Sequence, residues 1–324
     1  MSHSNLQPES GIAGKFISTA KDENGVLSAI EFHNDEHFNF AYDVVDVLGK
    51  TKPDKLAMLH IANSGKERRI TFKDMMVYSN KAANYFRFLG IKRGDRVMLV
   101  LKRHYQFWFA ILALHKIGAI AIPATNLLVK KDFEYRLKAG KIDAVLCTSD
   151  GKVAQEVERA SKTYDGLKAK IMVGSSTLVG WRNFNRDIRF FSPEFKKPTD
   201  VPGGDDPMLM FFTSGTTSYP KIAAHSYKYA LGHFITAKYW QQVDPDGIHF
   251  TISDTGWGKA LWGKLYGQWL CEAAVFTYDF DEFYASEILK MIEKYKITTF
   301  CAPPTVYRVM VHMKLDHFDL SSLS

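Results

Sequence analysis

Cysteines are few in this sequence, and no motif pairs them. Cys147, Cys271 and Cys301 are the three cysteines among 324 residues, and no CxxC spacing occurs. Each lies in an apolar stretch with the composition of a strand, which is typical of buried, reduced thiols. Because thiols stay reduced in the cytosol, we expect a cytoplasmic protein.

Long apolar segments are also absent. No run of apolar residues approaches the roughly 20 residues that a membrane-spanning helix needs. The N-terminal stretch MSHSNLQPESGIAGKF lacks the apolar core of a signal peptide. We therefore expect no membrane partner, and we interpret residues 1–38 as a lead-in whose first part is mobile.

Positive charge is in modest excess and is dispersed. The net charge is +7, from 42 Lys and Arg against 35 Asp and Glu, and the basic clusters KERR and KRGDR are short. A nucleic-acid-binding protein would show a denser basic stripe with interleaved aromatic residues, so we expect no nucleic-acid partner. A dispersed basic excess suits small substrates that carry several phosphates.

Short apolar strands alternate with amphipathic helices along most of the chain. The strands are continuous runs of Val, Ile, Leu and Ala, as in VMLVL and AVLCT, which indicates burial on both faces. This pattern predicts an α/β protein whose parallel sheets are covered by helices on both sides. Thr71 and Asp74 form a capping box at the start of one helix, and Gly90 ends that helix. The predicted strands are 56–62, 97–101, 119–124, 144–148, 170–174, 208–213, 249–253, 273–278 and 298–303, and the other predicted helices are 106–118, 130–141, 153–164, 230–240, 285–295 and 305–313.

The composition changes to Asn, Arg, Asp, Pro and Gly between Gly180 and Pro207, which indicates a connection between two units. A chain of this length is also too long for one small domain. We therefore predict a lead-in (1–38), a first α/β subdomain (39–180) and a second α/β subdomain (181–324).

A loop rich in hydroxyl groups follows the predicted strand 208–213. It lies within FFTSGTTSYPK, and neither the Walker A pattern GxxxxGK[ST] nor the dinucleotide fingerprint GxGxxG occurs in the chain. Glycine lets a backbone approach a ligand closely, hydroxyl and backbone N–H groups donate to anionic oxygens, and lysine supplies a point charge. By composition, the loop is either a phosphate-binding loop or a polar surface turn. Its candidate phosphate-binding residues are Thr213, Ser214, Gly215, Thr216, Thr217 and Lys221.

Three motifs in this chain resemble those of one enzyme family. TSGTTSYPK resembles the phosphate-binding signature TSGTTGxPK of the AMP-forming acyl-CoA synthetases, which belong to the adenylate-forming enzymes. ISDTGWGKALWGKLYGQWLCEAAVF is similar to the acyl-binding segment of acetyl- and medium-chain acyl-CoA synthetases, and APPTVYRVM to the segment beside the acyl pocket. FNFAYDVVD, ITFKDM, GIKRGDRV and GAIAIPAT stand in family order, so the resemblance covers the chain from about Asn39.

The resemblance implies the large N-terminal domain of the adenylate-forming fold, with its layers in the order αβαβα, and a two-step ligase. A short- or medium-chain carboxylic acid would attack the α-phosphate of ATP to give acyl-AMP and pyrophosphate, and CoA would then displace AMP to give acyl-CoA. ATP, Mg²⁺ and CoA are thus implied as cosubstrates. The loop would hold the β- and γ-phosphates, and Trp257, Gly258 and Val306 would bind the acyl group.

Two features depart from the family pattern. Ser218 stands where the family usually has Gly, which costs roughly 1 kcal/mol if that backbone needs a positive φ. The chain stops at FDLSSLS, before the family's adenine-binding segment, its Mg²⁺-binding Glu and the small C-terminal domain with the catalytic Lys. We therefore assign no catalytic residue and no metal ligand. We expect a truncated fold with an exposed sheet edge, which does not complete acyl-CoA synthesis by itself.

Other interpretations stay open from the residues alone. Trp257, Trp262 and Trp269 are either ligand-site residues, which the glycines around them favour, or ordinary core residues. His225 and His233 have no Asp or Cys at metal spacing, which argues against a zinc site. The alternative functions are a non-catalytic remnant that binds nucleotide or acyl groups, and a phosphotransferase, for which no kinase motif is present. Acyl chain length and oligomeric state do not follow from the sequence.

Overall fold

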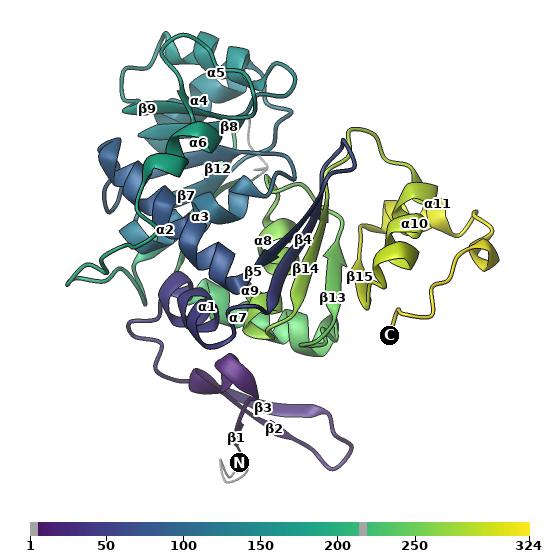
Figure 1. Cartoon of the computed structure of the whole chain (residues 1–324). Helices are drawn as coiled ribbons and strands as arrows, with labels where there is room; N and C mark the ends of the chain where they lie inside the picture. Colours follow the sequence, from purple (N-terminus) through teal and green to yellow (C-terminus); the bar gives the residue numbers. More distant parts are fainter. Residues whose placement is uncertain (1–5, 214–218) are drawn as a thin grey trace.

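Two sheets of mostly parallel strands form the framework of the protein (Figure 1). The computed structural model describes residues 6–213 and 219–324. The larger sheet has seven strands, and its centre is made of the continuous apolar runs that the sequence predicts to be buried on both faces. In spatial order these strands are β10 (Arg182–Asn183), β9 (Ala169–Val173), β8 (Ala144–Thr148), β6 (Arg96–Val100), β7 (Ile120–Pro123), β11 (Pro207–Thr213) and β12 (Lys221–Ser226).

The smaller sheet has five strands and combines segments from both halves of the chain. Four of them run parallel, whereas β5 pairs with β4 as an antiparallel hairpin. In spatial order they are β15 (Thr299–Cys301), β13 (Ile248–Thr251), β14 (Ala274–Tyr278), β4 (Leu56–Ile61) and β5 (Glu67–Thr71). Strand β15 therefore lies at an edge of this sheet.

Helices cover both faces of both sheets. Successive side chains on a strand point to opposite faces, so each strand contacts helices on both sides. Val97 and Leu99 of β6 face the helices between the sheets, whereas Met98 and Val100 face the outer helices. The layers therefore follow the order αβαβα, which confirms the predicted fold class (Figure 1). The helices between the sheets are α2 (Phe72–Phe88) and α3 (Gln106–Ile117), with α1 (Asp46–Thr51), α7 (Tyr229–Ile235), α8 (Gly258–Lys264) and α9 (Tyr266–Leu270) packed beside them. The outer helices are α4 (Lys130–Gly140) and α5 (Val153–Ser161) on the larger sheet, and α10 (Ala285–Tyr295) and α11 (Pro304–Met310) on the smaller one.

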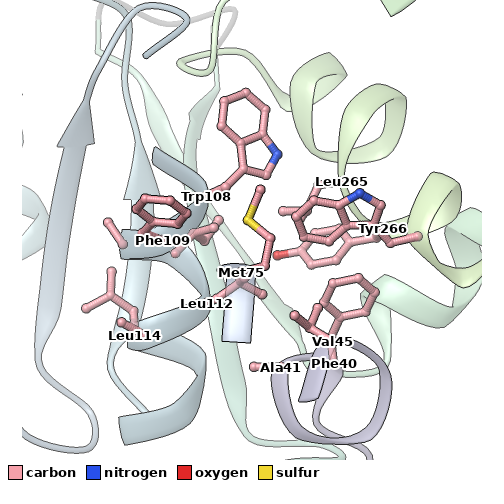
Figure 2. Close-up of a cluster of buried hydrophobic side chains, with 14 of the residues drawn as sticks. Phe40, Ala41, Val45, Met75, Trp108, Phe109, Leu112, Leu114, Leu265 and Tyr266 are labelled. Carbon is pink, nitrogen blue, oxygen red and sulfur yellow. The ribbon is translucent and has the colours of Figure 1, made fainter. Parts of the chain in front are cut away.

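The layer between the sheets is an apolar core with large aromatic side chains (Figure 2). The Trp108 and Trp269 side chains are fully buried, and each indole N–H has a carbonyl partner. Trp108 donates to Lys264 O at 3.0 Å and Trp269 donates to Ala57 O at 2.9 Å, which satisfies both buried donors. Trp269 is therefore the core residue of the three tryptophans whose role the sequence leaves open.

Residues near the N-terminus form regular structure where the sequence predicts a lead-in. Strands β1 (Gln7–Pro8), β2 (Ile17–Lys21) and β3 (Leu27–Phe32) make a three-stranded antiparallel sheet. Ile12 is buried, and its N–H donates to Glu272 Oε1 at 2.8 Å. Short strands with few apolar residues carry no clear periodic signal, which is why the sequence analysis did not predict these strands. The lead-in over residues 1–38 stays a prediction.

The chain after the hydroxyl-rich loop differs from the prediction in one respect. The sequence predicts no strand over residues 221–226, whereas the structure forms β12 there, which pairs antiparallel with β11 and places Lys221 opposite Thr213. Helix α7 and a π-helical turn (Thr236–Trp240) follow. Strands from before and after residue 180 share both sheets, and the division into subdomains at that residue stays a prediction.

Candidate functional site

The carboxyl ends of the parallel strands in the two sheets face each other. Strands β6 and β13 lie in different sheets, yet the Thr255 N–H and hydroxyl, just past β13, both donate to Lys102 O, just past β6, at 2.8 Å and 2.6 Å. Lys102 Nζ also lies 2.7 Å from Asp281 Oδ1, which follows β14. Ligands of open α/β sheets bind beyond the carboxyl ends of the strands, so this crevice is the place to look for a site.

The two ends of the predicted phosphate loop lie on paired strands at this edge. Thr213 ends β11 and Lys221 begins β12, with the Thr213 hydroxyl donating to Lys221 O at 3.4 Å. Lys221 is an exposed residue. The remaining predicted residues of the loop, Ser214, Gly215, Thr216, Thr217 and the unusual Ser218, lie outside the described residues.

Helix α4 holds the C-terminal side of this loop. The Tyr135 hydroxyl donates to Pro220 O at 2.8 Å, and the rings of Tyr135 and Tyr219 stack with centroids 4.8 Å apart. The strand that begins at Lys221 is thereby fixed both by its pairing with β11 and by a helix of the outer layer.

The predicted acyl-binding turn lies beside β11. Trp257 precedes α8 and its side chain is 57% exposed, so it is not a core residue. A Cβ atom added at Gly256 would lie 2.4 Å from Ala124 C, so only glycine permits this approach to the end of β7. A Cβ atom at Gly258 would lie 4.0 Å from the ring of Phe211, on β11. The structure thus brings the Trp257–Gly258 turn next to the strand that leads into the loop.

Val306, the third predicted acyl-binding residue, has a different environment. It lies in α11, which follows β15, the parallel neighbour of β13. Its side chain is buried in the apolar cluster of the outer helices, which also contains Ile252 and Ala302. The structure therefore gives Val306 a packing role, and its assignment to acyl binding stays a prediction.

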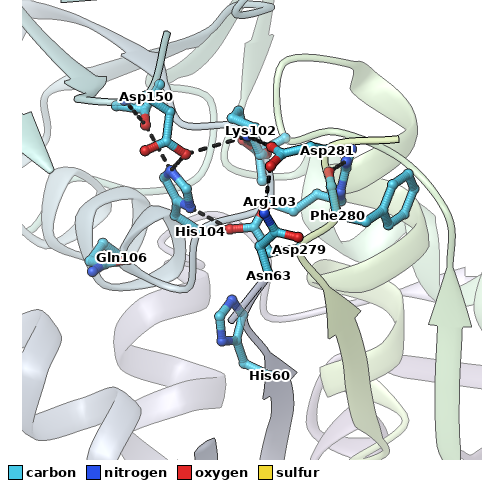
Figure 3. A network of polar contacts seen from close by, with 12 residues as sticks. His60, Asn63, Lys102, Arg103, His104, Gln106, Asp150, Asp279, Phe280 and Asp281 are labelled. Atoms are coloured by element: carbon cyan, nitrogen blue, oxygen red, sulfur yellow. Dashed lines mark hydrogen bonds and ion pairs between the residues drawn. The ribbon is translucent and has the colours of Figure 1, made fainter. Parts of the chain in front are cut away.

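A polar network that the sequence analysis missed joins the strand ends of the two sheets (Figure 3). We call it the strand-end cluster. Its central side chain is His104, whose Nδ1 lies 2.6 Å from Asp279 Oδ2 and whose Nε2 lies 2.7 Å from Thr148 Oγ1. A second carboxylate, Asp150, lies 3.5 Å from Nε2. The cluster consists of Lys102, Arg103, His104, Asp150, Asp254, Asp279 and Asp281.

The charges of this cluster stabilise one another. Burial by itself would lower the pKa of His104, but its hydrogen bonds to Asp150 and Asp279 outweigh burial and raise that pKa to about 9. The hydrogen bond to His104 lowers the pKa of Asp150 to about 2. Burial raises the pKa of Asp279, yet His104 and the nearby cations lower it overall. At neutral pH the cluster therefore holds an imidazolium between two carboxylates.

Arg103 connects the predicted acyl-binding turn to the rest of the cluster. Its guanidinium pairs with Asp254, three residues before Trp257, and also donates to Phe280 O. The guanidinium carbon lies 3.8 Å from the centroid of the Phe280 ring, a cation–π contact. A single buried side chain thus fixes the start of the turn against the end of β14.

Two further buried polar atoms lie in this region. Burial lowers the pKa of His60 to about 4, so the imidazole is neutral at physiological pH. His60 Nε2 and Asp279 Oδ1 have no hydrogen-bond partner among the residues that the structure describes. Buried polar atoms of this kind are usually satisfied by water or a ligand, which is consistent with a site at the strand ends.

The carboxylates of the cluster are already engaged by cations, which bears on the Mg²⁺ that the family resemblance implies. Asp150, Asp279 and Asp281 pair with His104 and Lys102. Within the two described ranges, no group of three or more His, Cys, Asp and Glu residues is arranged to hold a metal ion. The described residues therefore do not make a Mg²⁺ site, and no step is assigned to a metal.

Two charged segments directly after buried strands could have indicated the strand-end cluster from the sequence. KRH follows VMLVL directly, and DFD follows AAVFTY, so both charged groups begin where a buried strand ends. Charged residues in that position of an α/β sheet are candidates for the ligand edge. The partners, however, are 175 residues apart for His104 and Asp279, and sequence spacing does not show such pairs.

The fold and the facing strand ends define an adenylate-forming α/β architecture, and comparisons with known proteins agree. Two solved structures share the fold: the anthranilate CoA ligase AuaEII in complex with anthranoyl-AMP (TM-score 0.79, 23% identity, covering 89% of this chain and 54% of that chain) and Brucella canis acyl-CoA synthetase (TM-score 0.75, 21% identity, covering 86% and 49%). A sequence model described as "AMP-binding enzyme" matches residues 46–324. The chain therefore belongs to the AMP-binding enzyme family.

Curated relatives narrow the resemblance to acyl-CoA synthetases. Human acyl-coenzyme A synthetase ACSM3, mitochondrial, is 34% identical over 300 residues, and rat acyl-coenzyme A synthetase ACSM5, mitochondrial, is 36% identical over 295 residues. Each match covers 89% of this chain and 50% of the relative, so the chain spans about half the length of these proteins. The predicted resemblance to AMP-forming acyl-CoA synthetases, over their N-terminal portion, is confirmed.

One prediction is wrong by the same comparison. Reduced, buried thiols and the lack of a signal-peptide core led to a cytoplasmic assignment, whereas these relatives are mitochondrial proteins. Reduced cysteines do not separate the two locations by themselves. Across the described residues, no helix has the length and apolar character needed to cross a bilayer.

Proposed function

We propose that this chain supplies the phosphate grip and part of the acyl site of an AMP-forming acyl-CoA synthetase acting on a short- or medium-chain carboxylic acid. The observation that carries the proposal is the position of the Trp257–Gly258 turn beside Phe211 of β11, the strand that ends at Thr213. An acid bound at this turn would lie close to phosphates bound at the loop, which is the arrangement that acyl-AMP formation requires.

In the first step, a carboxylate oxygen of the acid would attack the α-phosphorus of ATP, and pyrophosphate would leave with the electron pair of the broken P–O bond. Lys221 and the hydroxyl-rich loop from Thr213 to Thr217 would stabilise the negative charge on the β- and γ-phosphates. The CoA thiol would then displace AMP to give the thioester.

The acyl-binding turn would orient the acid for this attack. The exposed Trp257 ring offers an apolar surface to the acyl chain, and Arg103 holds the turn by its ion pair with Asp254. Because Arg103 touches the turn rather than the reacting atoms, we regard it as a positioning residue. Chain-length preference would depend on what surrounds Trp257.

ATP–pyrophosphate exchange tests the proposal. The gene product that carries this sequence is assayed with labelled pyrophosphate, ATP and Mg²⁺, with acetate, butyrate, octanoate or no acid. Exchange that requires an added acid supports a ligase, because acyl-AMP formation is the step that the assay reverses. Loss of the γ-phosphate to another acceptor without acid would favour a phosphotransferase, and absence of both exchange and ATP binding would favour a non-catalytic remnant.

A further inference from the structure

A cavity lies beside the layer between the sheets, lined by none of the described residues of the predicted loop and acyl turn. Its volume is about 450 Å³, within the range of small-molecule sites. Its walls come from β5, α2, the start of α3, α6 (Phe184–Asp187) and the 3₁₀ turn η3 (Ile188–Phe190). We call it the arginine pocket; its lining is Arg68, Arg69, Ile70, Asp74, Tyr78, Tyr105, Gln106, Phe109, Asn185, Ile188 and Arg189.

The charge of this pocket is positive. Arg68, Arg69 and Arg189 line it, against a single carboxylate, Asp74, whose Oδ2 accepts from the Thr71 N–H and the Thr71 hydroxyl, both at 3.0 Å. In the described parts of the chain, ion pairs engage other arginines but none of these three. Arg68 Nη1 lies 3.5 Å from His60 Nδ1, a neutral group at physiological pH. Guanidinium groups with no carboxylate partner favour an anionic ligand with paired oxygens, such as a phosphate or carboxylate.

One wall of the pocket is aromatic. The Tyr78 and Phe109 rings stack with centroids 4.8 Å apart at an interplanar angle of 16°, and Tyr105 meets Phe109 edge to face at 5.6 Å. Arg68 lies over the Tyr105 ring, 4.8 Å from its centroid. Tyr78 is 40% exposed, so part of its ring remains accessible for stacking. This wall suits a planar ring on the ligand.

Two polar side chains that line the pocket, Gln106 and Asn185, are joined by a hydrogen bond. Gln106 is 6% exposed, and its Nε2 donates to Asn185 Oδ1 at 3.1 Å. This hydrogen bond joins helix α3 to α6 at the wall of the cavity that both residues line. Because this hydrogen bond already fixes both side chains, a ligand would not have to order them, which reduces the entropic cost of binding.

We propose that the arginine pocket binds a small molecule that combines a planar ring with an anionic group. The ring stacks on Tyr78, and the anionic group lies among the guanidinium groups of Arg68, Arg69 and Arg189. A nucleoside monophosphate and an aromatic carboxylate share this chemistry. The site is separate from the described residues of the proposed ligase site, since none of Thr213, Lys221, Trp257, Gly258 and Val306 lines the cavity.

Titration calorimetry with four probes tests the proposal: AMP, which has both groups; adenosine, which lacks the phosphate; ribose 5-phosphate, which lacks the base; and benzoate, a ring with a carboxylate. We expect AMP or benzoate to bind, and each half-molecule of AMP to bind at least about tenfold more weakly than AMP, since charged hydrogen bonds and stacking each contribute on this scale. Binding of AMP without benzoate would assign the site to nucleotides, and the reverse would assign it to aromatic carboxylates.

Variants separate this site from the phosphate loop. The double substitution Arg69→Ser, Arg189→Ser should weaken binding by about tenfold or more, and Tyr78→Ala by about threefold to tenfold. Arg69 and Arg189 are exposed, so the double variant is expected to fold, and its melting temperature is measured beside wild type. Arg182→Ser, at an exposed arginine outside the pocket, should leave this binding unchanged. Binding that Lys221→Ala removes and the double variant keeps would overturn the proposal, as would a wild-type protein that binds neither AMP nor benzoate. These results do not depend on ligase activity, so either proposal can fail alone.

Discussion

Two regions connect the two sheets, one through apolar packing and the other through charged and polar contacts. The apolar layer around Trp108 and Trp269 buries large side chains, and the two indole N–H groups donate to backbone carbonyls (Figure 2). The strand-end cluster around His104 instead joins the sheets through charges and directional hydrogen bonds (Figure 3). Apolar burial is non-directional and contributes most of the stability, whereas paired charges fix geometry and contribute little net energy. The contrast predicts that damage to the first region unfolds the protein and damage to the second mainly displaces the site.

The largest expected effect comes from truncating the apolar layer. Trp108→Ala removes a fully buried side chain and should lower the free energy of unfolding by about 3–5 kcal/mol. Urea denaturation followed by circular dichroism measures this change. Trp240→Ala, at a tryptophan that is 64% exposed, is the matched control and should cost less than about 1 kcal/mol. Equal losses in the two variants would show that the layer is not the main source of stability.

The strand-end cluster should instead make stability depend on pH. The pKa of His104 in the folded protein, about 9, lies above its ordinary value of 6.5. The stabilisation by the imidazolium is therefore fully present below about pH 6.5 and is lost as pH rises through about 9. Unfolding free energies at pH 6 and pH 9.5 are compared for wild type and His104→Gln. The difference between the two proteins should shrink by an amount on the order of 2 kcal/mol at the higher pH. A difference that stays constant with pH would contradict a charged His104.

A smaller stability effect, with a larger functional one, is expected at Arg103. Arg103→Met leaves Asp254 without its cation, but Asp254 is 24% exposed, so water reduces the cost to about 1–2 kcal/mol. Because the acyl-binding turn loses its anchor, the KM for the acid in the exchange assay should rise about tenfold while the KM for ATP changes little. Arg159→Met, at an exposed ion pair within one helix, serves as the control. A parallel rise in both KM values would contradict a local displacement of the turn.

The sequence predicted the parts of the fold that depend on local pattern. Continuous apolar runs identified the central strands because burial on both faces leaves no alternation, and the helix predicted at 285–295 matches α10. The capping box of Thr71 and Asp74 is present in the structure, with both of its hydrogen bonds formed. The short strands β1, β2, β3, β5, β10 and β12 were missed, since two to six residues with mixed polarity carry little periodic signal.

Residues of the candidate site were predicted only where they lie within a sequence motif. Thr213 and Lys221 came from the composition of the loop and Trp257 from the family resemblance, whereas the distinction between an exposed Trp257 and a buried Trp269 required the packing of the whole molecule. His104 and Arg103 were missed because their partners lie on strands far along the chain, where neither composition nor spacing shows them.

Lys221 offers the most direct test of the proposed site, because it would supply the positive charge at the phosphate loop. The acid-dependent ATP–pyrophosphate exchange rate is measured for wild type, Lys221→Ala and Lys228→Ala, a lysine just past the other end of β12 that pairs with Asp35 and Asp205. If Lys221 stabilises the transferring phosphates, Lys221→Ala should lower the rate by about a hundredfold, and Lys228→Ala should leave it within about twofold. Equal rates for Lys221→Ala and wild type would contradict a phosphate site at the junction of β11 and β12.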